Sequence, residues 1–254
     1  MSGHNKWSTI KHKKGKADAA RGKIFTKIIR LITVSAREGG GDPSTNSNLR
    51  LILEKAKISN MPKDTIQKAV KRGTGELSGV DYEEMSYEGY GPGGAAVITM
   101  CLTDNKNRTV SEVRHMFSKY GGNLGENGCV SWIFEKKGLF LIDGTEKTDD
   151  EIMDIVLEAG GDEYSLVEES EEEKIYEVYC EPNDFMTVKE ELEKVIAVKE
   201  SKMTLFPKNT VKLEGKKAKQ MLTLMEYLED CDDVQEVFSN YDIDDKLVEE
   251  IMNV

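Results

Sequence analysis

Basic residues dominate the start of the chain: Lys and Arg supply nine of the first thirty residues, against one acidic residue. The aromatic residue Trp7 lies within this stretch. Its basic neighbours are Lys6, Lys11, Lys13 and Lys14. Cationic side chains neutralise phosphates, and an indole ring stacks on an unpaired base. The N-terminal arm, residues 1–15, therefore predicts binding to nucleic acid. The alternative for Trp7 is that it packs against the chain's own helices.

A second set of residues suited to phosphates or bases lies between positions 89 and 115. The segment GYGPGG (89–94) predicts tight turns that present Tyr90, whose ring could stack on a base or pack against a partner. A purely structural turn is the alternative. The segment DNKNRTVSEVRH is basic within an acidic region and predicts a phosphate-contact patch, or else an ordinary helix start. Its relevant residues are Asn107, Arg108, Arg114 and His115.

No pattern in the sequence indicates catalysis. The three histidines, His4, His12 and His115, have no Cys, Asp or His partner at the spacing of metal ligands. No Walker-type phosphate loop occurs, and GYGPGG precedes an expected strand instead of opening a helix. No GxSxG nucleophile motif occurs either. We therefore expect a protein that is not an enzyme and has no metal, no cofactor and no small-molecule substrate.

The charge is divided unevenly along the chain. Residues 1–72 carry 17 Lys and Arg against 5 Asp and Glu, whereas the remainder carries 18 against 42. Such an asymmetry predicts a basic binding element joined to an acidic body that repels polyanions. The four cysteines form no CxxC pair, and nothing precedes the first motif that resembles a cleavable leader. The longest apolar run, AAVITMCL, is too short to cross a bilayer. We expect reduced thiols and a cytoplasmic protein without membrane partners.

The basic residues continue into an expected helix over residues 16–38, which should end at GGG (39–41). Its apolar residues form one wide face, and its cations fall together on the opposite margin as a ridge. These are Lys16, Lys23, Lys27, Arg30 and Arg37. Helices over 47–58 and from Pro62 to Gly73 complete a three-helix bundle, and residues 73–81 read as a linker.

The remaining elements alternate between strands and helices. Strands are expected at 95–102, 129–135, 139–142, 164–169, 174–180, 198–206 and 234–241. Helices are expected at 108–120, 148–159, 184–195 and 216–230. The first of these helices has capping-box spacing at Thr109 and Glu112, with Gly121 as its C-terminal cap, and EESEEE (168–173) reads as a solvated hairpin tip.

This order predicts an α+β multidomain protein. An N-terminal three-helix bundle is followed by an α+β domain with a ferredoxin-like (βαββαβ) domain inserted in it. The predicted boundaries are 1–77 for the arm and bundle, 78–135 plus 206–254 for the middle domain, and 136–205 for the insertion.

Five motifs together resemble the YebC family. They are GHNKWSTIKHKKGKADAARGKIFTKI, GGGDP, NMPKDTI, YEGYGPGG and DNKNRTVSEVRHMFSKYGGNLG, and they occur in order across residues 3–125. The family includes bacterial proteins named probable transcriptional regulators and a mitochondrial translational activator. The resemblance implies the same three-domain layout. It also implies that the basic arm with Lys16, then Arg21, Lys23, Lys27 and the GYGPGG loop face nucleic acid.

The sequence supports three functions. In the first, the protein associates with ribosomal RNA or the ribosome and assists translation through stalling sequences, as the resemblance implies for part of the family. In the second, it is a DNA-binding transcriptional regulator. In the third, it is an adaptor whose arm binds an acidic protein. No helix-turn-helix or zinc finger is visible, which favours RNA over sequence-specific reading of a duplex.

Overall fold

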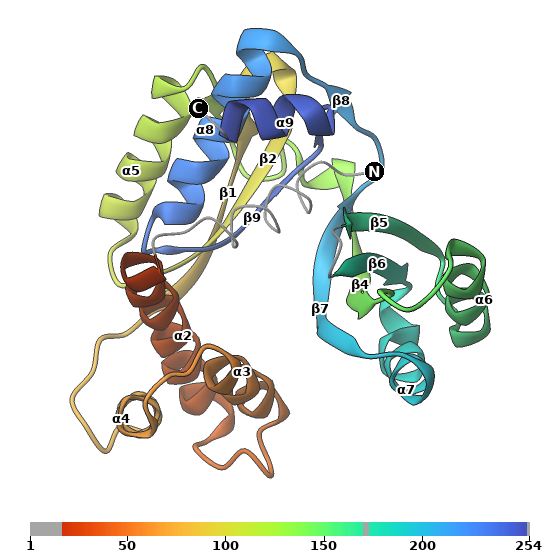
Figure 1. Ribbon diagram of the computed structural model, residues 1–254. Helices are drawn as coiled ribbons and strands as arrows, with labels where there is room; N and C mark the ends of the chain where they lie inside the picture. Colours follow the sequence, from red (N-terminus) through yellow and green to blue (C-terminus); the bar gives the residue numbers. More distant parts are fainter. Residues whose placement is uncertain (1–16, 170–172, 253–254) are drawn as a thin grey trace. The chain divides into compact units, whose positions relative to one another are not determined.

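The computed structural model describes residues 17–169 and 173–252 (Figure 1). Within these residues the chain forms two compact units. The first consists of residues 17–130 and 215–238, and the second of residues 131–169, 173–214 and 239–252. Helices at the N-terminus are followed by sheets that are combined with helices, which confirms a mixed α+β fold.

The first unit begins with the predicted three-helix bundle, made of α2 (Ala17–Gly39), α3 (Ser47–Ile58) and α4 (Lys63–Gly73). Its core contains the apolar residues that the helical periodicity predicted. These are Ile28, Ile32, Leu49, Ala56 and Ala69, with Ile24, Phe25, Ile29, Ile52, Leu53, Ile66 and Val70 packed around them. The boundaries follow local chemistry, because Gly40 after α2 has φ +83° and Pro62 caps α4.

Asn46 fixes the turn between α2 and α3. Its side-chain oxygen accepts a hydrogen bond from the Leu49 backbone N–H at 2.9 Å, as an N-cap does. Its amide nitrogen donates to the carbonyl oxygens of Ser35 and Gly40, each at 2.8 Å. A single buried amide therefore satisfies backbone groups at the end of one helix and at the start of the next.

The same unit contains a four-stranded sheet with the order β3-β1-β2-β9. Its strands are β1 (Glu83–Tyr90), β2 (Ala96–Thr103), β3 (Asn123–Leu124) and β9 (Val234–Ser239). The sheet joins distant parts of the chain, because β9 pairs with β2. Two helices of this unit, α5 (Lys106–Lys119) and α8 (Gly215–Asp230), lie side by side (Figure 1).

Strand β1 was missed by the sequence analysis. It pairs antiparallel with β2 along its whole length, from Glu83 opposite Thr103 to Tyr90 opposite Ala96. Its sequence, EEMSYEGY, is rich in acidic residues and contains glycine, which strands generally disfavour. The continuous partner strand, which only the tertiary structure supplies, outweighs that weak local preference.

The strand expected at 129–135 is wrong. Residues Ser131–Ile133 form a 3₁₀ turn, and β4 begins at Phe134. The cause is the buried carboxylate of Glu88, which accepts hydrogen bonds from the backbone N–H groups of Gly128 and Val130, each at 2.9 Å. These N–H groups are directed at a side chain and therefore do not join a strand ladder.

The capping box expected at Thr109 and Glu112 is also wrong. The N-cap of α5 is Asn105, whose side chain accepts from the Arg108 N–H at 3.0 Å, so the helix begins at Lys106. The Thr109 hydroxyl instead donates to a carboxylate oxygen of Asp233 at 2.7 Å. Gly121 follows the helix with φ +86°, which confirms the predicted C-terminal glycine.

The second unit contains a β-α-β-β-α-β segment. Its elements are β4 (Phe134–Asp143), α6 (Asp149–Ala159), β5 (Glu163–Glu169), β6 (Lys174–Cys180), α7 (Phe185–Val195) and β7 (Val198–Pro207). The sheet order is β5-β6-β4-β7, and all neighbouring strands run antiparallel. A core that includes Phe140, Ile142, Ile152, Tyr176 and Leu192 joins the helices to the sheet. Part of the expected hairpin tip, residues 170–172, lies outside the described residues.

The last expected strand, 234–241, is divided in the structure. Strand β9 ends at Ser239, and β10 (Tyr241–Asp242) pairs in parallel with β8 (Val211–Lys212) in the second unit. Asn240 between them donates its side-chain N–H to the Asn209 backbone oxygen at 3.1 Å. The chain therefore changes sheets at this asparagine. The final helix, α9 (Asp245–Met252), follows.

Candidate nucleic-acid interface

The predicted cationic ridge of α2 lies against acidic parts of its own unit. Lys23 pairs with Asp230 at 3.1 Å, and Lys27 donates to the backbone oxygen of Glu229 at 2.7 Å. Arg37, further along α2, pairs with Asp81 at 3.3 Å. The ridge exists, but these cations have partners inside the protein. Their contact with nucleic acid stays a prediction.

Arg30 is the most enclosed member of the ridge. Its side chain is 11% exposed, and its guanidinium donates to Asp233 at 2.6 Å and to the Leu102 backbone oxygen at 2.8 Å. The Asp233 carboxylate is 4% exposed and also accepts from Arg108 at 2.9 Å and from Thr103 at 3.2 Å. Arg30 is therefore a largely buried cation that stabilises the fold, and its contact with nucleic acid stays a prediction.

The Asp233 network explains the charge state of its members. Burial would raise the pKa of Asp233, but hydrogen bonds from Thr109, Arg108 and Arg30 hold it below its ordinary value. The same carboxylate, together with Asp104, raises the pKa of Arg108. The predicted site residue Arg108 is therefore paired twice, although 41% of its side chain is exposed.

An acidic cleft lies beside this network. Its volume is about 610 Å³, and its lining includes Asp104, Glu112, Asp230, Asp232 and Asp233 besides the cations Lys23, Arg30 and Arg108. The carboxylates outnumber the cations here, so the cleft disfavours a polyanion. The nucleic-acid contacts predicted for Lys23, Arg30 and Arg108, which line this cleft, stay predictions.

Two other predicted residues, Arg114 and Tyr90, are open to solvent. Arg114 lies on the exposed face of α5. Tyr90 is 39% exposed, and its hydroxyl donates to the Cys129 backbone oxygen at 3.0 Å, so the ring has a fixed position at the end of β1. In the GYGPGG loop, Gly93 and Gly94 have φ values of +78° and +85°, which favour glycine.

The loop is held by a close backbone approach at Gly122. A Cβ atom at this position would lie 2.6 Å from the Tyr90 backbone oxygen and 3.2 Å from the Phe117 ring. We therefore expect Gly122→Ala to destabilise the unit by about 1–3 kcal/mol, because a backbone oxygen cannot move aside as a side chain can. Chemical denaturation checks this value. Gly22→Ala is the control. A Cβ atom added at Gly22 would meet no neighbouring side chain or other element within 4 Å, so alanine at this helical site should be neutral or stabilising. Equal stability of Gly122→Ala and wild type would contradict the expectation.

The remaining predicted residues are not placed. Lys6, Trp7, Lys11, Lys13, Lys14 and Lys16 lie outside the described residues, and Arg21 is placed only as part of α2. Their proposed contacts, and the alternative position of Trp7 against the bundle, stay predictions.

The structure reveals a set of cations that the sequence analysis did not single out. Seven Lys and Arg side chains on α3 and α4 are exposed, and none forms an ion pair with any described residue. We call them the bundle cations: Arg50, Lys55, Lys57, Lys63, Lys68, Lys71 and Arg72. The signal in the sequence was the excess of Lys and Arg over residues 1–72, which includes these seven positions.

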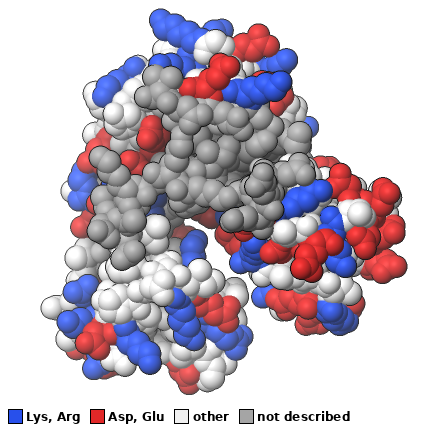
Figure 2. Space-filling view, in the orientation of Figure 1, with Lys and Arg blue, Asp and Glu red and all other residues white. Residues whose placement is uncertain are grey.

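The charge of the two units differs visibly. Figure 2 shows Lys and Arg side chains, with some Asp and Glu, on the bundle at the lower left of the view, and many Asp and Glu side chains interspersed with Lys on the unit on the right. Lysines of the second unit are commonly paired: Lys137 contacts both Asp162 and Glu181, at 2.9 and 2.6 Å. The helices α3 and α4 thus carry seven exposed cations without an ion pair to a described residue, and further ones, such as Arg114 on α5 and Lys216 on α8, lie elsewhere in the first unit.

Among residues 17–169 and 173–252, no group of three or more His, Cys, Asp or Glu side chains is placed to hold a metal ion. No described helix is long and apolar enough to span a bilayer. All four cysteines are free, and burial raises the pKa of the Cys101 thiol to about 12.

Comparison with known proteins covers nearly the whole chain. Residues 5–76 match the TACO1/YebC protein N-terminal domain, and residues 82–241 match the TACO1/YebC second and third domain. A probable transcriptional regulatory protein of Geobacter sulfurreducens is 54% identical over 99% of this chain and 100% of its own length. One of Desulforapulum autotrophicum is 52% identical over 97% of this chain and 98% of its own.

A solved structure agrees with the fold. The crystal structure of a conserved hypothetical protein from Aquifex aeolicus superposes with a TM-score of 0.81, at 43% sequence identity, over 93% of this chain and 96% of that chain. The agreement extends over both units, and the sequence matches cover the bundle as well as the sheets. The chain belongs to the TACO1/YebC family.

Proposed function

We propose that this protein is a non-enzymatic regulator of gene expression that binds RNA, with the ribosome or ribosomal RNA as its partner. The observation that carries the proposal is the set of bundle cations, which are exposed and have no acidic partner among the described residues. Phosphates are the ligands that such cations bind, and counterion release supplies the free energy. The N-terminal arm would add further phosphate contacts and the stacking ring of Trp7.

The division of charge favours folded RNA over a long duplex. The chain carries a net −12, although its first 72 residues are strongly basic. A uniform duplex would bring phosphates close to the acidic remainder, whereas a folded RNA offers irregular pockets and unpaired bases to a limited basic surface. The domain layout of the proposal is the one predicted above: an arm and bundle at 1–77, a middle domain at 78–135 plus 206–254, and a ferredoxin-like insertion at 136–205.

Transcriptional regulation through DNA is the second candidate, and one observation favours it. Relatives that are 54% and 52% identical over nearly their full lengths are named probable transcriptional regulatory proteins. Under this alternative the same cations would contact duplex phosphates. The third candidate function is that of an adaptor that binds an acidic protein. Such an adaptor would show little salt-sensitive binding to RNA or DNA.

Ribosome co-sedimentation at graded salt tests the proposal. We expect the protein to sediment with ribosomes at low salt and to dissociate steeply as salt rises, with a log–log slope near −0.7 per phosphate neutralised on single strands. It should also bind structured ribosomal RNA more tightly than duplex DNA of equal length at the same salt. A sequence-dependent footprint on promoter DNA without ribosome association would support the transcriptional alternative instead. Binding to neither would refute the proposal.

A further inference from the structure

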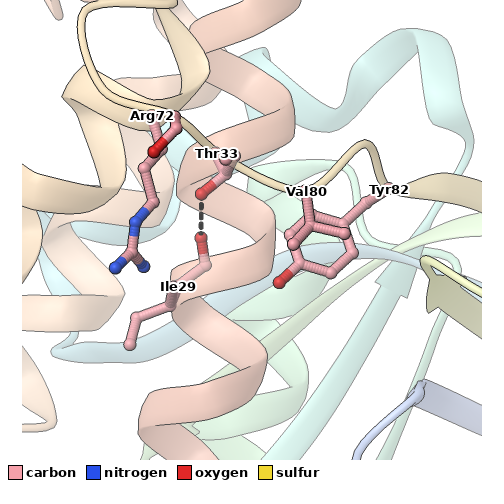
Figure 3. Close-up of a pocket in the computed structure, with 7 residues that line it drawn as sticks. Ile29, Thr33, Arg72, Val80 and Tyr82 are labelled. Carbon is pink, nitrogen blue, oxygen red and sulfur yellow. Dashed lines mark hydrogen bonds between the residues drawn. The ribbon is translucent and has the colours of Figure 1, made fainter.

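A cleft of about 420 Å³ opens beside the bundle cations, in the first unit. It is lined by residues from α2, from the end of α4 and from the segment that leads into β1. These are Ile29, Thr33, Arg72, Ser78, Gly79, Val80 and Tyr82. In Figure 3, the Arg72 guanidinium and the Tyr82 ring lie on either side of Ile29 and Thr33. The volume lies within the range of about 300–1,000 Å³ that small-molecule sites occupy.

The segment that forms one wall of the cleft is held by specific contacts. Arg37 pairs with Asp81 and donates to the Tyr82 backbone oxygen at 2.8 Å. Nearer the start of the segment, the Leu77 N–H donates to the Lys71 backbone oxygen at 3.1 Å. Residues 74–82 form no helix or strand, but hydrogen bonds at both ends keep them over α2 and α4. The cleft is thus formed before any ligand arrives.

The start of this segment, at the end of α4, requires a glycine. A Cβ at Gly73 would collide with the Thr33 backbone oxygen and with the Ala36 side chain, so α4 ends in close contact with α2. Gly79 lies against the aliphatic part of the Arg72 side chain: a Cβ atom added at Gly79 would lie 3.3 Å from the Cβ of Arg72. The close approach of these backbones fixes where the Arg72 side chain leaves the helix.

The lining of the cleft combines apolar and polar surface in similar amounts, with a cation at one side. Ile29, Val80 and the ring of Tyr82 supply apolar surface, and Val80 is 51% exposed. The Arg30 guanidinium lies 5.4 Å from the centre of the Tyr82 ring, which fixes the ring by a cation–π contact. Thr33 already donates its hydroxyl to the Ile29 backbone oxygen at 2.8 Å. Arg72 is exposed and forms no ion pair with a described residue.

We propose that this cleft binds one unpaired nucleotide of an RNA. Its base would lie against the Tyr82 ring and the apolar wall, and its phosphate would pair with Arg72. A nucleotide combines the flat face of its base with an anionic phosphate. An aromatic ring can stack on the base while a neighbouring exposed guanidinium pairs with the phosphate. A base within a perfect duplex is stacked and paired, so it cannot enter. This inference rests on the proposed binding of RNA, and it adds a preference for unpaired bases.

The choice of a nucleotide over other occupants follows from the surrounding charge. Lys68 and Lys71 lie on the same helix as Arg72 and are exposed, so the approach to the cleft is positive. The larger cleft beside Asp233 is also lined by Tyr82, together with Tyr227, but five carboxylates against three cations make its lining acidic. Of these two clefts, the one beside Arg72 combines an aromatic wall with a positive approach.

The test uses two RNA hairpins that differ by a single bulged adenosine, with the full-length protein. We expect the wild type to bind the bulged hairpin about tenfold more tightly than the fully paired one, as a stacking contact typically provides. In Tyr82→Ala and in Arg72→Gln this ratio should fall close to one. Tyr82→Ala should largely keep the affinity for the paired hairpin, whereas Arg72→Gln also removes a bundle cation and should weaken that affinity about as much as Lys71→Ala does. Replacing the bulged base by 2-aminopurine gives a second readout, because its fluorescence should fall on binding to the wild type and not to Tyr82→Ala.

Lys71→Ala is the matched control, because it removes a neighbouring exposed cation outside the cleft lining. It should weaken both hairpins equally and leave the ratio unchanged. Arg72→Gln concerns an exposed side chain and guards against the case in which Tyr82→Ala does not fold. A ratio that both cleft variants leave unchanged would overturn the inference without affecting the proposed function. If the wild type does not bind the hairpins, and binds neither ribosomes nor ribosomal RNA, the proposed function itself is refuted.

Discussion

Asp233→Ala should lower the free energy of unfolding of the first unit by about 3–5 kcal/mol, the cost of breaking a buried ion pair by removing one partner. The substitution leaves the Arg30 guanidinium, 11% exposed, without its carboxylate, and it removes the acceptor of the Thr109 hydroxyl. Native-state hydrogen exchange of amides in β2 and α5 measures the effect, because it reports the opening free energy of this unit separately from the rest of the chain.

Asp230→Ala is the matched control for this prediction. It breaks the pair with Lys23, in which the two side chains are 42% and 46% exposed, so its effect should stay below about 1 kcal/mol. Comparable exchange in the two variants would contradict the role assigned to burial.

Acid should remove the stabilisation that Asp233 provides. The folded-state pKa of this carboxyl lies below its ordinary value of 3.8, so its contribution is present above that pH and is lost as the pH falls through the folded-state pKa. The difference in stability between the wild type and Asp233→Ala should therefore shrink as the pH falls below 3.8. A difference that does not change at low pH would show that the carboxylate charge is not involved.

Replacement of Lys63, Lys68 and Lys71 by Ala should weaken binding to ribosomal RNA roughly a hundredfold at about 0.1 M salt. Each lost phosphate contact lowers the magnitude of the log–log salt slope by about 0.7, so three contacts change it by about 2. Filter binding over a range of salt concentrations measures both quantities. The reason for the large effect is that these three lysines form no ion pair with any residue that the structure describes, so their charge is available to phosphate.

A second triple variant separates this effect from the change in net charge. Lys189, Lys194 and Lys202 lie in the second unit, and each pairs with a nearby glutamate, at 3.7, 2.6 and 3.1 Å. Their replacement by Ala changes the net charge of the protein equally, but the salt slope should stay near that of the wild type. An equal loss of affinity in both triple variants would indicate a general electrostatic effect and not a phosphate-binding surface on α4.

Local sequence signals predicted much of the fold because its helices are strongly amphipathic. The apolar faces that include Ile28, Leu49 and Ala69 were identified from periodicity, and the helix ends followed from glycine and proline. Strand β1 was missed because its side chains are largely acidic or small, so its identity depends on β2. The error at 129–135 has a similar cause, since a distant carboxylate, Glu88, binds the backbone N–H groups there.

The sequence predicted the charge of the candidate site but not the contacts of its residues within the fold. The excess of positive charge over residues 1–72 is a property of the sequence alone, as is the family resemblance carried by its motifs. Periodicity placed Lys23, Lys27 and Arg30 together on one face of α2 but did not reveal what that face contacts. The acidic partners of Lys23 and Arg30, Asp230 and Asp233, are about two hundred residues away in the chain.

The sequence by itself therefore determined the helices, the sign of the charge and the family, because periodicity, composition and motifs are local properties. The tertiary structure decided which cations are neutralised inside the fold and which are open to phosphate. It also brought Tyr82, Arg72 and Ile29 together around one cleft. The physical reason is that Coulomb interactions and burial depend on distance in space and not on distance along the chain. Strands from a distant part of the chain, such as β9, bring together residues that no local sequence pattern connects.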